Sequence, residues 1–358
     1  MRALFLSSNG VGLGHLARQM AVADRLPADC RAHFATMSYA VRLAMERGYL
    51  TFFLAHHRAN GLDVETWNAR LEAELALHVE ALRPDVLVYD ATAVYSGLLE
   101  ITWKYPQVRR IWLRRAMWRE EHAKFLLNED RFDLVIEPGE LAEALDEGPT
   151  RGARAAVTRV PPVLHLDPAA RLDRTAARAA LGLPDEATVI GLQLANDGHL
   201  DGAAIQEALG RRMAADPALH VLEFRSPLLP PVTEGALGPR HRVVATFPAF
   251  RLGTACDLSV SAAGYNSFHE NVLGAVPTLF VPNESPEMDL QLNRARWAEG
   301  NGMAATWRRD DPPALFSAAL DRLLDPAERA AMAARCRAIE WTNGADEIAA
   351  IVAGEGGR

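Results

Sequence analysis

The sequence predicts an α/β protein made of two Rossmann-like, doubly wound domains that face each other across an interdomain cleft. Its 358 residues suit two domains of ordinary size. Hydrophobic residues make up 49% of the chain and charged residues 23%, which supplies two apolar cores and excludes a disordered chain. Short apolar runs alternate with amphipathic stretches of helical length, and this pattern is typical of βαβ units around a parallel sheet.

The first half contains six apolar runs that we predict to be strands. They are Ala3–Ser7, Ala32–Thr36, Thr51–Leu54, Val86–Tyr89, Arg110–Leu113 and Leu134–Ile136. Helices fit between them. The clearest helix spans Val64–Leu82 and stops at Arg83-Pro84, because proline cannot continue a helix. Another, Leu16–Leu26, follows a Gly-rich loop after the first strand.

A break separates the two halves. Residues 137–159 are rich in Gly, Pro and charge, and residues 160–164 (Val-Pro-Pro-Val-Leu) are predicted to form a stiff extended linker. The strand pattern then restarts with Thr188–Leu192, Val221–Phe224, Val243–Thr246, Leu258–Ser261, Thr278–Val281 and Ala304–Trp307. We assign residues 1–160 to an N-terminal domain and 161–358 to a C-terminal domain. Whether the last helix packs back on the N-terminal domain is left open.

Charge and cysteine content exclude several classes of protein. The net charge of −8 disfavours a nucleic-acid partner. No apolar run reaches the roughly 18 residues of a membrane span, and the apolar start of the chain is too short for a signal peptide. Three widely separated cysteines, Cys30, Cys256 and Cys336, offer no metal-ligand spacing. We expect a cytoplasmic protein without a transmembrane segment, bound metal or cofactor.

The first motif is the loop of residues 9–15, Asn-Gly-Val-Gly-Leu-Gly-His, between the first strand and the first helix. Gly12 and Gly14 let the backbone approach a ligand, and the helix N-terminus attracts an anion. A dinucleotide site is disfavoured, because His15 breaks the Gly-x-Gly-x-x-Gly spacing and Thr36-Met37, not an acidic residue, ends the second strand.

His15 is the candidate catalytic base. It is expected at the tip of the first strand, where a helix N-terminus lowers the pKa of a histidine and keeps it neutral. Asp90 ends a buried strand and could orient His15, as the carboxylate of a catalytic triad does. The alternatives are that His15 merely caps its helix and that Asp90 caps the helix beginning near Ala93. His56 and His57, near the same edge by strand counting, could line an acceptor site.

The second motif, residues 261–270 (Ser-Ala-Ala-Gly-Tyr-Asn-Ser-Phe-His-Glu), is the strongest signal in the chain. A strand ends at Ser261 and a helix begins at Gly264. Its N-terminus, with Asn266 and Ser267, could bind a diphosphate. Glu270 lies further along the helix, where its carboxylate could accept paired hydrogen bonds from a ribose diol. An ordinary βα turn capped by Asn and Ser explains these residues singly, but not the whole run.

Together these segments resemble the donor-binding signature of GT-B-fold UDP-sugar glycosyltransferases. The matching residues are Gly264-Tyr265-Asn266-Ser267-x-x-Glu270, the later Gly-x-Pro-x-Leu-Phe-x-Pro, and Asp289-x-Gln291-x-x-Arg294-Ala295. The group includes the bacterial enzyme that adds N-acetylglucosamine to the peptidoglycan lipid precursor, and the plant and antibiotic glycosyltransferases. The Gly-x-Gly-His loop agrees, and the resemblance is strongest over residues 245–300. It implies an acceptor-side N-terminal domain, a donor-side C-terminal domain and inverting transfer without a metal, which suits a chain that has no Asp-x-Asp.

The sequence departs from the family pattern in three places. Ala262 stands where the plant enzymes carry a histidine that contacts diphosphate. Asp289 lies one residue earlier than the partner of Gln291 in their Asp-Gln pair. A loop containing Asn196 replaces the phosphate-binding loop after the first strand of the second domain, and Asn196 could still approach phosphate. Phe247 follows a strand where family members place the base, so it could stack on uracil or pack in the core.

An arginine-rich segment also carries two tryptophans. Its members are Arg109, Arg110, Arg114, Arg115 and Arg119, with Trp112 and Trp118. The cluster could meet an anionic acceptor or a membrane surface, as a peripheral contact, or form a solvated edge of the domain.

The function that the resemblance implies is hexosyl transfer from a UDP- or dTDP-sugar to an acceptor hydroxyl, in bacterial natural-product or cell-envelope glycosylation. Two alternatives remain. A nucleotide-sugar hydrolase or epimerase could use the same fold, and a hydrolase that releases modified sugars also has a Gly-x-Gly-His loop followed by Arg, as in His15-Leu16-Ala17-Arg18. A catalytically inactive partner subunit could bind the nucleotide sugar alone.

Overall fold

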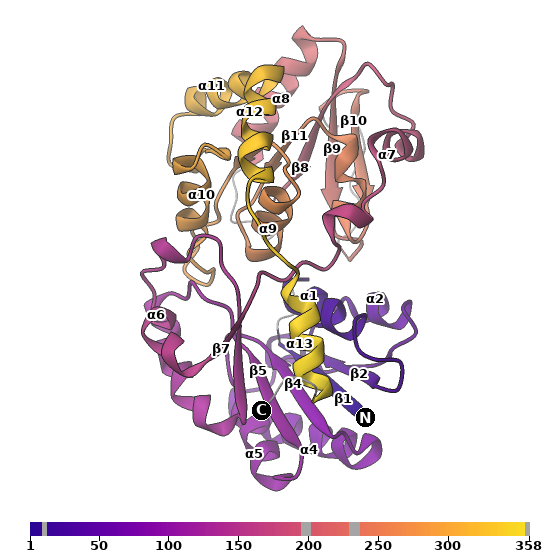
Figure 1. The fold of residues 1–358 in the computed structure, drawn as a ribbon, viewed down its shortest axis with the longest axis vertical. Coiled ribbons are helices and arrows are strands. Elements are labelled where there is room, and N and C mark those ends of the chain that lie inside the picture. Colours follow the sequence, from indigo (N-terminus) through magenta and orange to yellow (C-terminus); the bar gives the residue numbers. More distant parts are fainter. Residues whose placement is uncertain (9–12, 195–201, 229–236, 355–358) are drawn as a thin grey trace. The chain divides into compact units, whose positions relative to one another are not determined.

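The computed structural model describes residues 1–8, 13–194, 202–228 and 237–354. The chain divides into two compact units (Figure 1). Unit 1 comprises Met1–His165 and the segment that starts at Thr342, and unit 2 comprises Leu166–Trp341. The chain therefore changes unit after His165, five residues beyond the boundary expected from sequence, and the last helix belongs to unit 1.

Unit 1 is built on a seven-stranded sheet in the order β3-β2-β1-β4-β5-β6-β7, with every neighbouring pair parallel. Its strands are β1 (Arg2–Ser7), β2 (Arg31–Thr36), β3 (Leu50–Phe53), β4 (Val86–Asp90), β5 (Arg109–Leu113), β6 (Leu134–Pro138) and β7 (Thr158–Val160). The six predicted strands are present within two residues at each end. The seventh, β7, lies where the sequence predicted a break and linker, so that prediction was wrong for Thr158–Val160.

Helices cover both faces of this sheet. They are α1 (Gly14–Ala23), α2 (Val41–Met45), α3 (His57–Asn60), α4 (Val64–Leu82), α5 (Ser96–Lys104), α6 (Thr150–Ala153) and α13 (Gly344–Ala353), with 3₁₀ turns at Glu120–Arg131, Glu143–Leu145 and Arg154–Ala156. The α4 helix has the predicted bounds: the Asp63 carboxylate caps it by accepting from Thr66 N at 2.9 Å, and Arg83 ends it at φ 47°.

The alternation of side chains along β1 explains the two cores of unit 1. Leu4 and Leu6 point to one face and join a cluster with apolar residues of α4 and α5. Phe5 points to the other face, where its ring stacks on Phe34 at 5.2 Å. Both sets are fully buried.

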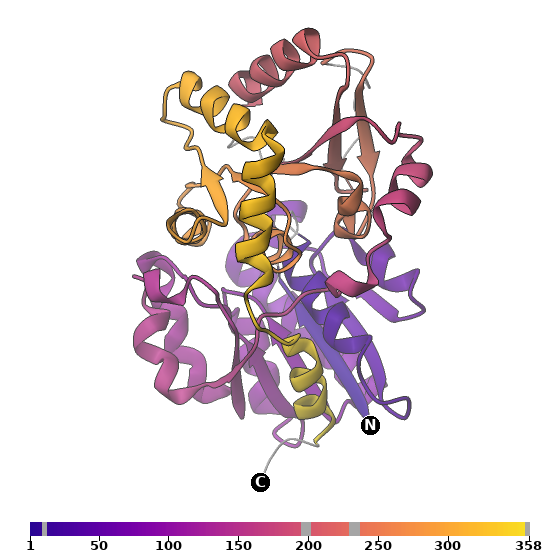
Figure 2. The same cartoon turned by 45° about the horizontal axis from the view of Figure 1, so that its top comes forward.

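Helix α13 returns to unit 1 and packs beside α1 in both views (Figures 1 and 2). Asn343 fixes its start, because its side chain accepts from Leu164 N at 3.2 Å and donates to Leu164 O at 2.9 Å. Arg25, two residues after the end of α1, pairs with Asp346 at 3.2 Å, and Ile348 is fully buried.

Unit 2 repeats the architecture with six parallel strands in the order β10-β9-β8-β11-β12-β13. The strands are β8 (Thr188–Gln193), β9 (Leu219–Arg225), β10 (His241–Ala245), β11 (Leu258–Ser261), β12 (Thr278–Phe280) and β13 (Ala304–Thr306). The helices are α7 (Arg174–Leu181), α8 (Gly202–Ala215), α9 (Tyr265–Leu273), α10 (Gln291–Gly300), α11 (Pro313–Leu324) and α12 (Pro326–Arg337), with 3₁₀ turns at Pro168–Ala170 and Ala249–Ala255.

Both sheets reverse their strand order once, between β1 and β4 in unit 1 and between β8 and β11 in unit 2. Ligands of open α/β sheets bind at such a switch point, beyond the carboxyl ends of the strands. Ser7 and Asp90 end the two switch-point strands of unit 1 and are aligned in register. The equivalent strand end in unit 2 is Ser261, which is aligned with Gln193.

The structure corrects the interpretation of the arginine-rich segment with two tryptophans. Trp112 and Trp118 are buried in the core of unit 1, and Arg114 is fully buried in ion pairs with Glu129 and Glu137. Arg110 pairs with Asp133 and Arg109 donates to Ile351 O at 2.8 Å. The buried tryptophans cannot contact a membrane surface, and Arg115 and Arg119 are partly buried. Of the helices in the described ranges, none is long and apolar enough to span a membrane.

Candidate active site

His15 lies in the first turn of α1, directly beyond the carboxyl end of β1. Asp90 is the last residue of β4, the neighbouring strand. His15 Nδ1 lies 2.7 Å from Asp90 Oδ1. The side chain of Asp90 is fully buried and that of His15 is 11% exposed. The structure therefore brings the two predicted catalytic residues together. If Asp90 instead capped the next helix, its carboxylate would accept hydrogen bonds from backbone N–H groups of that helix.

Arg18, one turn after His15 on α1, occupies both oxygens of the same carboxylate. Its Nε donates to Asp90 Oδ2 at 2.8 Å and its Nη2 donates to Asp90 Oδ1 at 2.6 Å. That Nη2 also lies 3.3 Å from His15 Nδ1. Arg18 is 2% exposed. The result is a buried cluster of three side chains, in which Oδ1 accepts from His15 and Arg18 together.

The protonation state of this cluster follows from its charges. Burial opposes ionisation of Asp90, but Arg18 and His15 outweigh it and lower the pKa of the carboxyl group. An ionised carboxylate only accepts hydrogen bonds, so His15 Nδ1 carries the proton and Nε2 keeps its lone pair. Burial also lowers the pKa of His15, and Arg115 and Arg18 add to that effect against Asp90. His15 is thus neutral at pH 7 and able to accept a proton.

His56 belongs to an aromatic cluster at the carboxyl end of β3. Its ring lies 5.1 Å from Trp67 and 4.2 Å from His57, and its Nε2 lies 3.4 Å from the hydroxyl of Tyr95. Burial, His57 and Arg58 lower the pKa of His56. The cluster stands at the same sheet edge as Asp90, and its suggested acceptor-lining role stays a prediction.

In unit 2, α9 begins after Gly264, as the sequence predicted. Gly264 takes the N-cap position with extended backbone and gives no side-chain cap. Asn266 and Ser267 in the first turn are partly buried, whereas the Tyr265 side chain is 2% exposed. The Tyr265 ring packs 4.3 Å from His269 and 5.8 Å from the Arg294 guanidinium. Tyr265 can therefore offer a ligand its backbone, but its side chain belongs to the core.

Glu270 lies on α9, partly buried. Burial raises the pKa of its carboxyl group to about 8, against the opposing charge of Arg171. Arg171 is itself held in place: it donates to Gly274 O at 2.9 Å and Pro168 O at 3.1 Å, and its guanidinium stacks 4.6 Å from the Phe250 ring. A carboxylate with this placement suits hydrogen bonds from a sugar diol.

Asp289 and Gln291 brace the same region. Arg294 Nη1 donates to Asp289 Oδ2 at 2.9 Å, and both side chains are buried. Gln291 Oε1 accepts from Asn283 N at 3.0 Å, and its Nε2 lies 3.7 Å from where a Cβ on Gly264 would stand. The Asp289 carboxylate thus pairs with Arg294, while the Gln291 amide lies near the start of α9, and the donor-binding roles predicted for both residues stay predictions.

Three other predicted donor residues need separate mention. Gly14 is the first residue of α1. Phe247 is partly buried, two residues beyond the end of β10. Gly12 and Asn196 lie outside the described residues.

Comparisons with known proteins identify the architecture. Neither protein-family models nor curated proteins match the chain. Among solved structures, MurG from Acinetobacter baumannii has a TM-score of 0.66 at 15% identity and covers 99% of this chain and 100% of its own. The glycosyltransferase SnogD from Streptomyces nogalater has a TM-score of 0.63 at 19% identity, covering 99% of each chain. The UDP-GlcNAc 2-epimerase from Neisseria meningitidis reaches 0.65 at 11% identity, covering 99% of each.

The chain has the GT-B fold. In this GT-B chain, each unit carries one of the two candidate clusters at the switch point of its own sheet. Within the described parts of the chain, no cluster of His, Cys, Asp and Glu could hold a metal ion.

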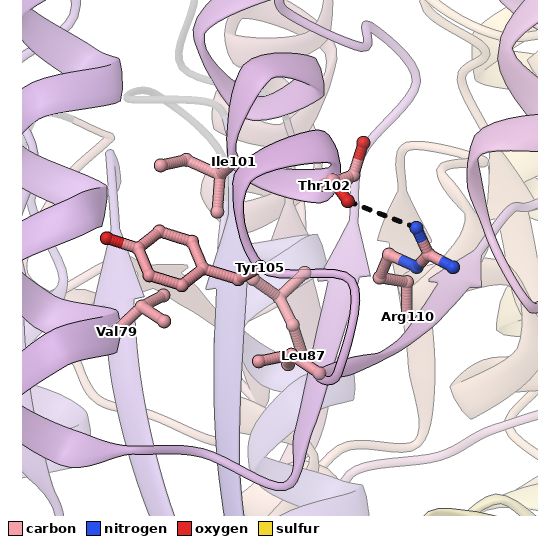
Figure 3. Close-up of a pocket in the computed structure, with 7 residues that line it drawn as sticks. Val79, Leu87, Ile101, Thr102, Tyr105 and Arg110 are labelled. Atoms are coloured by element: carbon pink, nitrogen blue, oxygen red, sulfur yellow. Dashed lines mark hydrogen bonds between the residues drawn. The ribbon is translucent and has the colours of Figure 1, made fainter.

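Two hollows in the GT-B structure are unsuited to a nucleotide sugar. One lies between α4, β4 and α5, lined by Val79, Leu87, Ile101, Tyr105 and Arg110 among others (Figure 3), and has a volume of about 10 Å³. It would scarcely hold one water molecule. The other has a volume of about 440 Å³, is lined by residues 299–302, Ala304, Arg322 and Arg335 among others, and adjoins the start of β13. It is therefore at the amino edge of the sheet, opposite the ligand edge.

Sequence reasoning missed the parts played by Arg18 and Arg171. Arg18 could have been found, because residues three apart share one helix face and a buried Asp90 requires a compensating charge. Arg171 follows a short 3₁₀ turn outside any motif, and its approach to Glu270 depends on tertiary packing.

Proposed function

We propose that this protein is an inverting glycosyltransferase that moves a hexose from a UDP- or dTDP-sugar to an acceptor hydroxyl without a divalent metal. The observation that carries the proposal is His15, held by a buried carboxylate with Nε2 as proton acceptor, at a sheet switch point of a GT-B chain. Similar structures support this: several are antibiotic glycosyltransferases, and one, the rhamnosyltransferase SpnG, is complexed with thymidine diphosphate.

The proposed reaction follows from the geometry of His15. Its Nε2 takes the proton of the acceptor hydroxyl, whose oxygen attacks the anomeric carbon of the donor in line. The new carbon–oxygen bond forms as the bond from that carbon to the diphosphate oxygen breaks, so the configuration inverts. Asp90 holds the imidazole in the required tautomer. The proton on His15 afterwards passes to solvent.

In unit 2, the start of α9 is proposed to hold the leaving diphosphate. Backbone N–H groups at a helix N-terminus and the Asn266 and Ser267 side chains can stabilise its negative charge. This replaces the role that a divalent cation plays elsewhere. Glu270 accepts hydrogen bonds from the ribose.

A nucleotide-sugar hydrolase or epimerase is the second candidate. The epimerase among the similar structures, which is bound to UDP-GlcNAc, supports it, as does an arginine three residues after the loop histidine. In a hydrolase, water would replace the acceptor hydroxyl at His15.

We place the activity in the cytoplasm. The acceptor would be a bacterial natural product or a cell-envelope precursor, since the similar structures include both kinds of enzyme by name.

The test begins with a thermal-shift panel of nucleoside diphosphates and nucleotide sugars, which identifies base and sugar. The best donor is then incubated alone and with an acceptor panel. His15→Ala should lower kcat by roughly a hundredfold or more while nucleotide affinity is unchanged, because a positioned base contributes about 10²–10⁴-fold. Cleavage or epimerisation of the donor alone would support the second candidate. Tight binding without turnover on any acceptor would indicate an inactive binding subunit, and near-normal turnover of His15→Ala would refute the proposed base.

A further inference from the structure

A histidine and a carboxylate alone form a strong base, because the negative charge stabilises the imidazolium that the proton transfer creates. In this protein the carboxylate is shared. Arg18 binds both oxygens of Asp90 at 2.6 and 2.8 Å, and only one of these oxygens also contacts His15, at 2.7 Å. Such a bidentate pair fixes the carboxylate in position and offsets its charge.

We propose that Arg18 is a positioning residue that offsets the charge of Asp90 at His15, so that Asp90 orients the imidazole while stabilising its protonated form less than an unpaired carboxylate would. Within the proposed function, on which this inference rests for its catalytic consequence, Arg18 adds to the effect of burial in keeping His15 an uncharged base at neutral pH. The imidazolium formed in the transfer then loses its proton readily to solvent.

A second arginine acts on His15 in the same direction as Arg18. The charged groups that face His15 are Asp90 from β4, which raises its pKa, and Arg115 from the segment after β5 and Arg18 from its own helix, which lower it. With His15 neutral, these three sum to one positive charge, which disfavours a further proton. Arg18 is 2% exposed and Asp90 is fully buried, so salt and water screen their interaction little.

The packing explains why Arg18 cannot swing away. Its neighbour Gln19 is also buried and donates to Leu6 O on β1 at 2.8 Å and to Val88 O on β4 at 3.1 Å. Helix α1 is thereby fastened to both switch-point strands at the turn that carries His15 and Arg18. The backbone from which Arg18 reaches Asp90 is therefore held against both strands.

The test uses Arg18→Met, which keeps the length of the side chain without its charge, and Arg18→Lys, which restores a charge. Arg178→Met is the matched control: Arg178 is equally buried and pairs with Asp257 at 3.0 Å, but lies in unit 2. The direct readout is NMR titration of the His15 ring in the full chain, with its signal assigned by its loss in His15→Ala. Melting temperatures establish that each variant is folded.

In Arg18→Met the His15–Asp90 pair should take up a proton at a pH at least one unit higher, a tenfold rise in proton affinity. Arg18→Lys should restore most of the wild-type behaviour, and Arg178→Met should leave the titration unchanged. If donor turnover is found, the acidic limb of its kcat/KM profile should move to higher pH in Arg18→Met alone. The proposal would be overturned if the midpoint of the His15 titration stayed unchanged or fell in a folded Arg18→Met variant. It would also be overturned if the midpoint moved equally in Arg178→Met. The titration needs no activity, so a shifted His15 without turnover on any acceptor would refute the proposed function and leave the role of Arg18 standing.

Discussion

Glu270 predicts how nucleotide affinity should depend on pH. Burial raises the pKa of this carboxyl group to about 8 in the free protein, with Arg171 opposing. A pKa raised by burial means that the group is mostly protonated at pH 7 and becomes ionised as the pH rises through 8. Hydrogen bonds from a ribose diol strengthen when the acceptor is ionised, so the deprotonated form should bind the nucleotide better.

The size of the effect follows from the ionised fraction. With a pKa of about 8, that fraction is about 0.1 at pH 7 and about 0.9 at pH 9, since each pH unit changes the ratio tenfold. If only the ionised form binds UDP well, the apparent Kd falls about tenfold over this interval. The phosphate charge stays constant in this window, because its last ionisation lies near pH 6 and is complete.

Isothermal titration calorimetry of UDP at pH 7, 8 and 9 measures the effect, with Glu270→Gln as the control. The amide cannot ionise, so its affinity should be flat with pH and weaker than that of wild type at both ends, with the larger deficit at pH 9. Arg171→Met should move the wild-type rise to higher pH, because Arg171 favours the ionised form. A wild-type affinity that is constant or falls with pH, or an equal rise in Glu270→Gln, would refute the assignment of this carboxylate to the ribose.

Three further predictions concern stability and metal use. Ile348→Ala should lower the free energy of unfolding of unit 1 by about 2–5 kcal/mol, because the side chain is fully buried. A denaturant titration measures the loss, with Ile348→Val, which should lose about 1 kcal/mol, as the control. Equal losses in the two variants would contradict the packing. Gly148→Ala should lower the melting temperature, because a Cβ there would lie 1.8 Å from Trp118 O, whereas Gly152→Ala, with open space, should not; melting curves that rank them otherwise would contradict this. Turnover of the donor should survive EDTA and gain nothing from added magnesium or manganese, and activity lost with EDTA and restored by either ion would count against α9 as the group that stabilises the leaving diphosphate.

Much of the fold could be predicted, because its strands are buried on both faces and stand out as apolar runs. All twelve predicted strands are present, as is Gly264 at the start of its helix. The strand β7 could not be predicted from Thr158–Val160 alone. It is three residues long at the sheet edge, and its pairing with β6 depends on contacts far away in the sequence.

The candidate site was predictable in part for the same reason. Asp90 ends one switch-point strand and His15 lies at the start of the helix that follows the other, so topology brings them together once the strand order is known. The fates of Asp289 and Tyr265 were not predictable, because both depend on the buried Arg294 guanidinium that packs between them. A sequence motif identifies which residues lie close together, but not which of them contact each other in the protein without a ligand.

The return of α13 to unit 1 determines the order in which the two units can be completed during synthesis. Residues 166–341 form unit 2 without interruption, so that unit can fold as soon as its last strand and helices leave the ribosome. Unit 1 begins earlier but must wait for the segment after Thr342, since Asn343 closes onto Leu164 and Ile348 is buried only when α13 is in place. The nascent chain therefore exposes, throughout the synthesis of unit 2, the apolar surface beside α1 that α13 later covers. A chain that stops near Trp341 would contain a complete unit 2 and an incomplete unit 1.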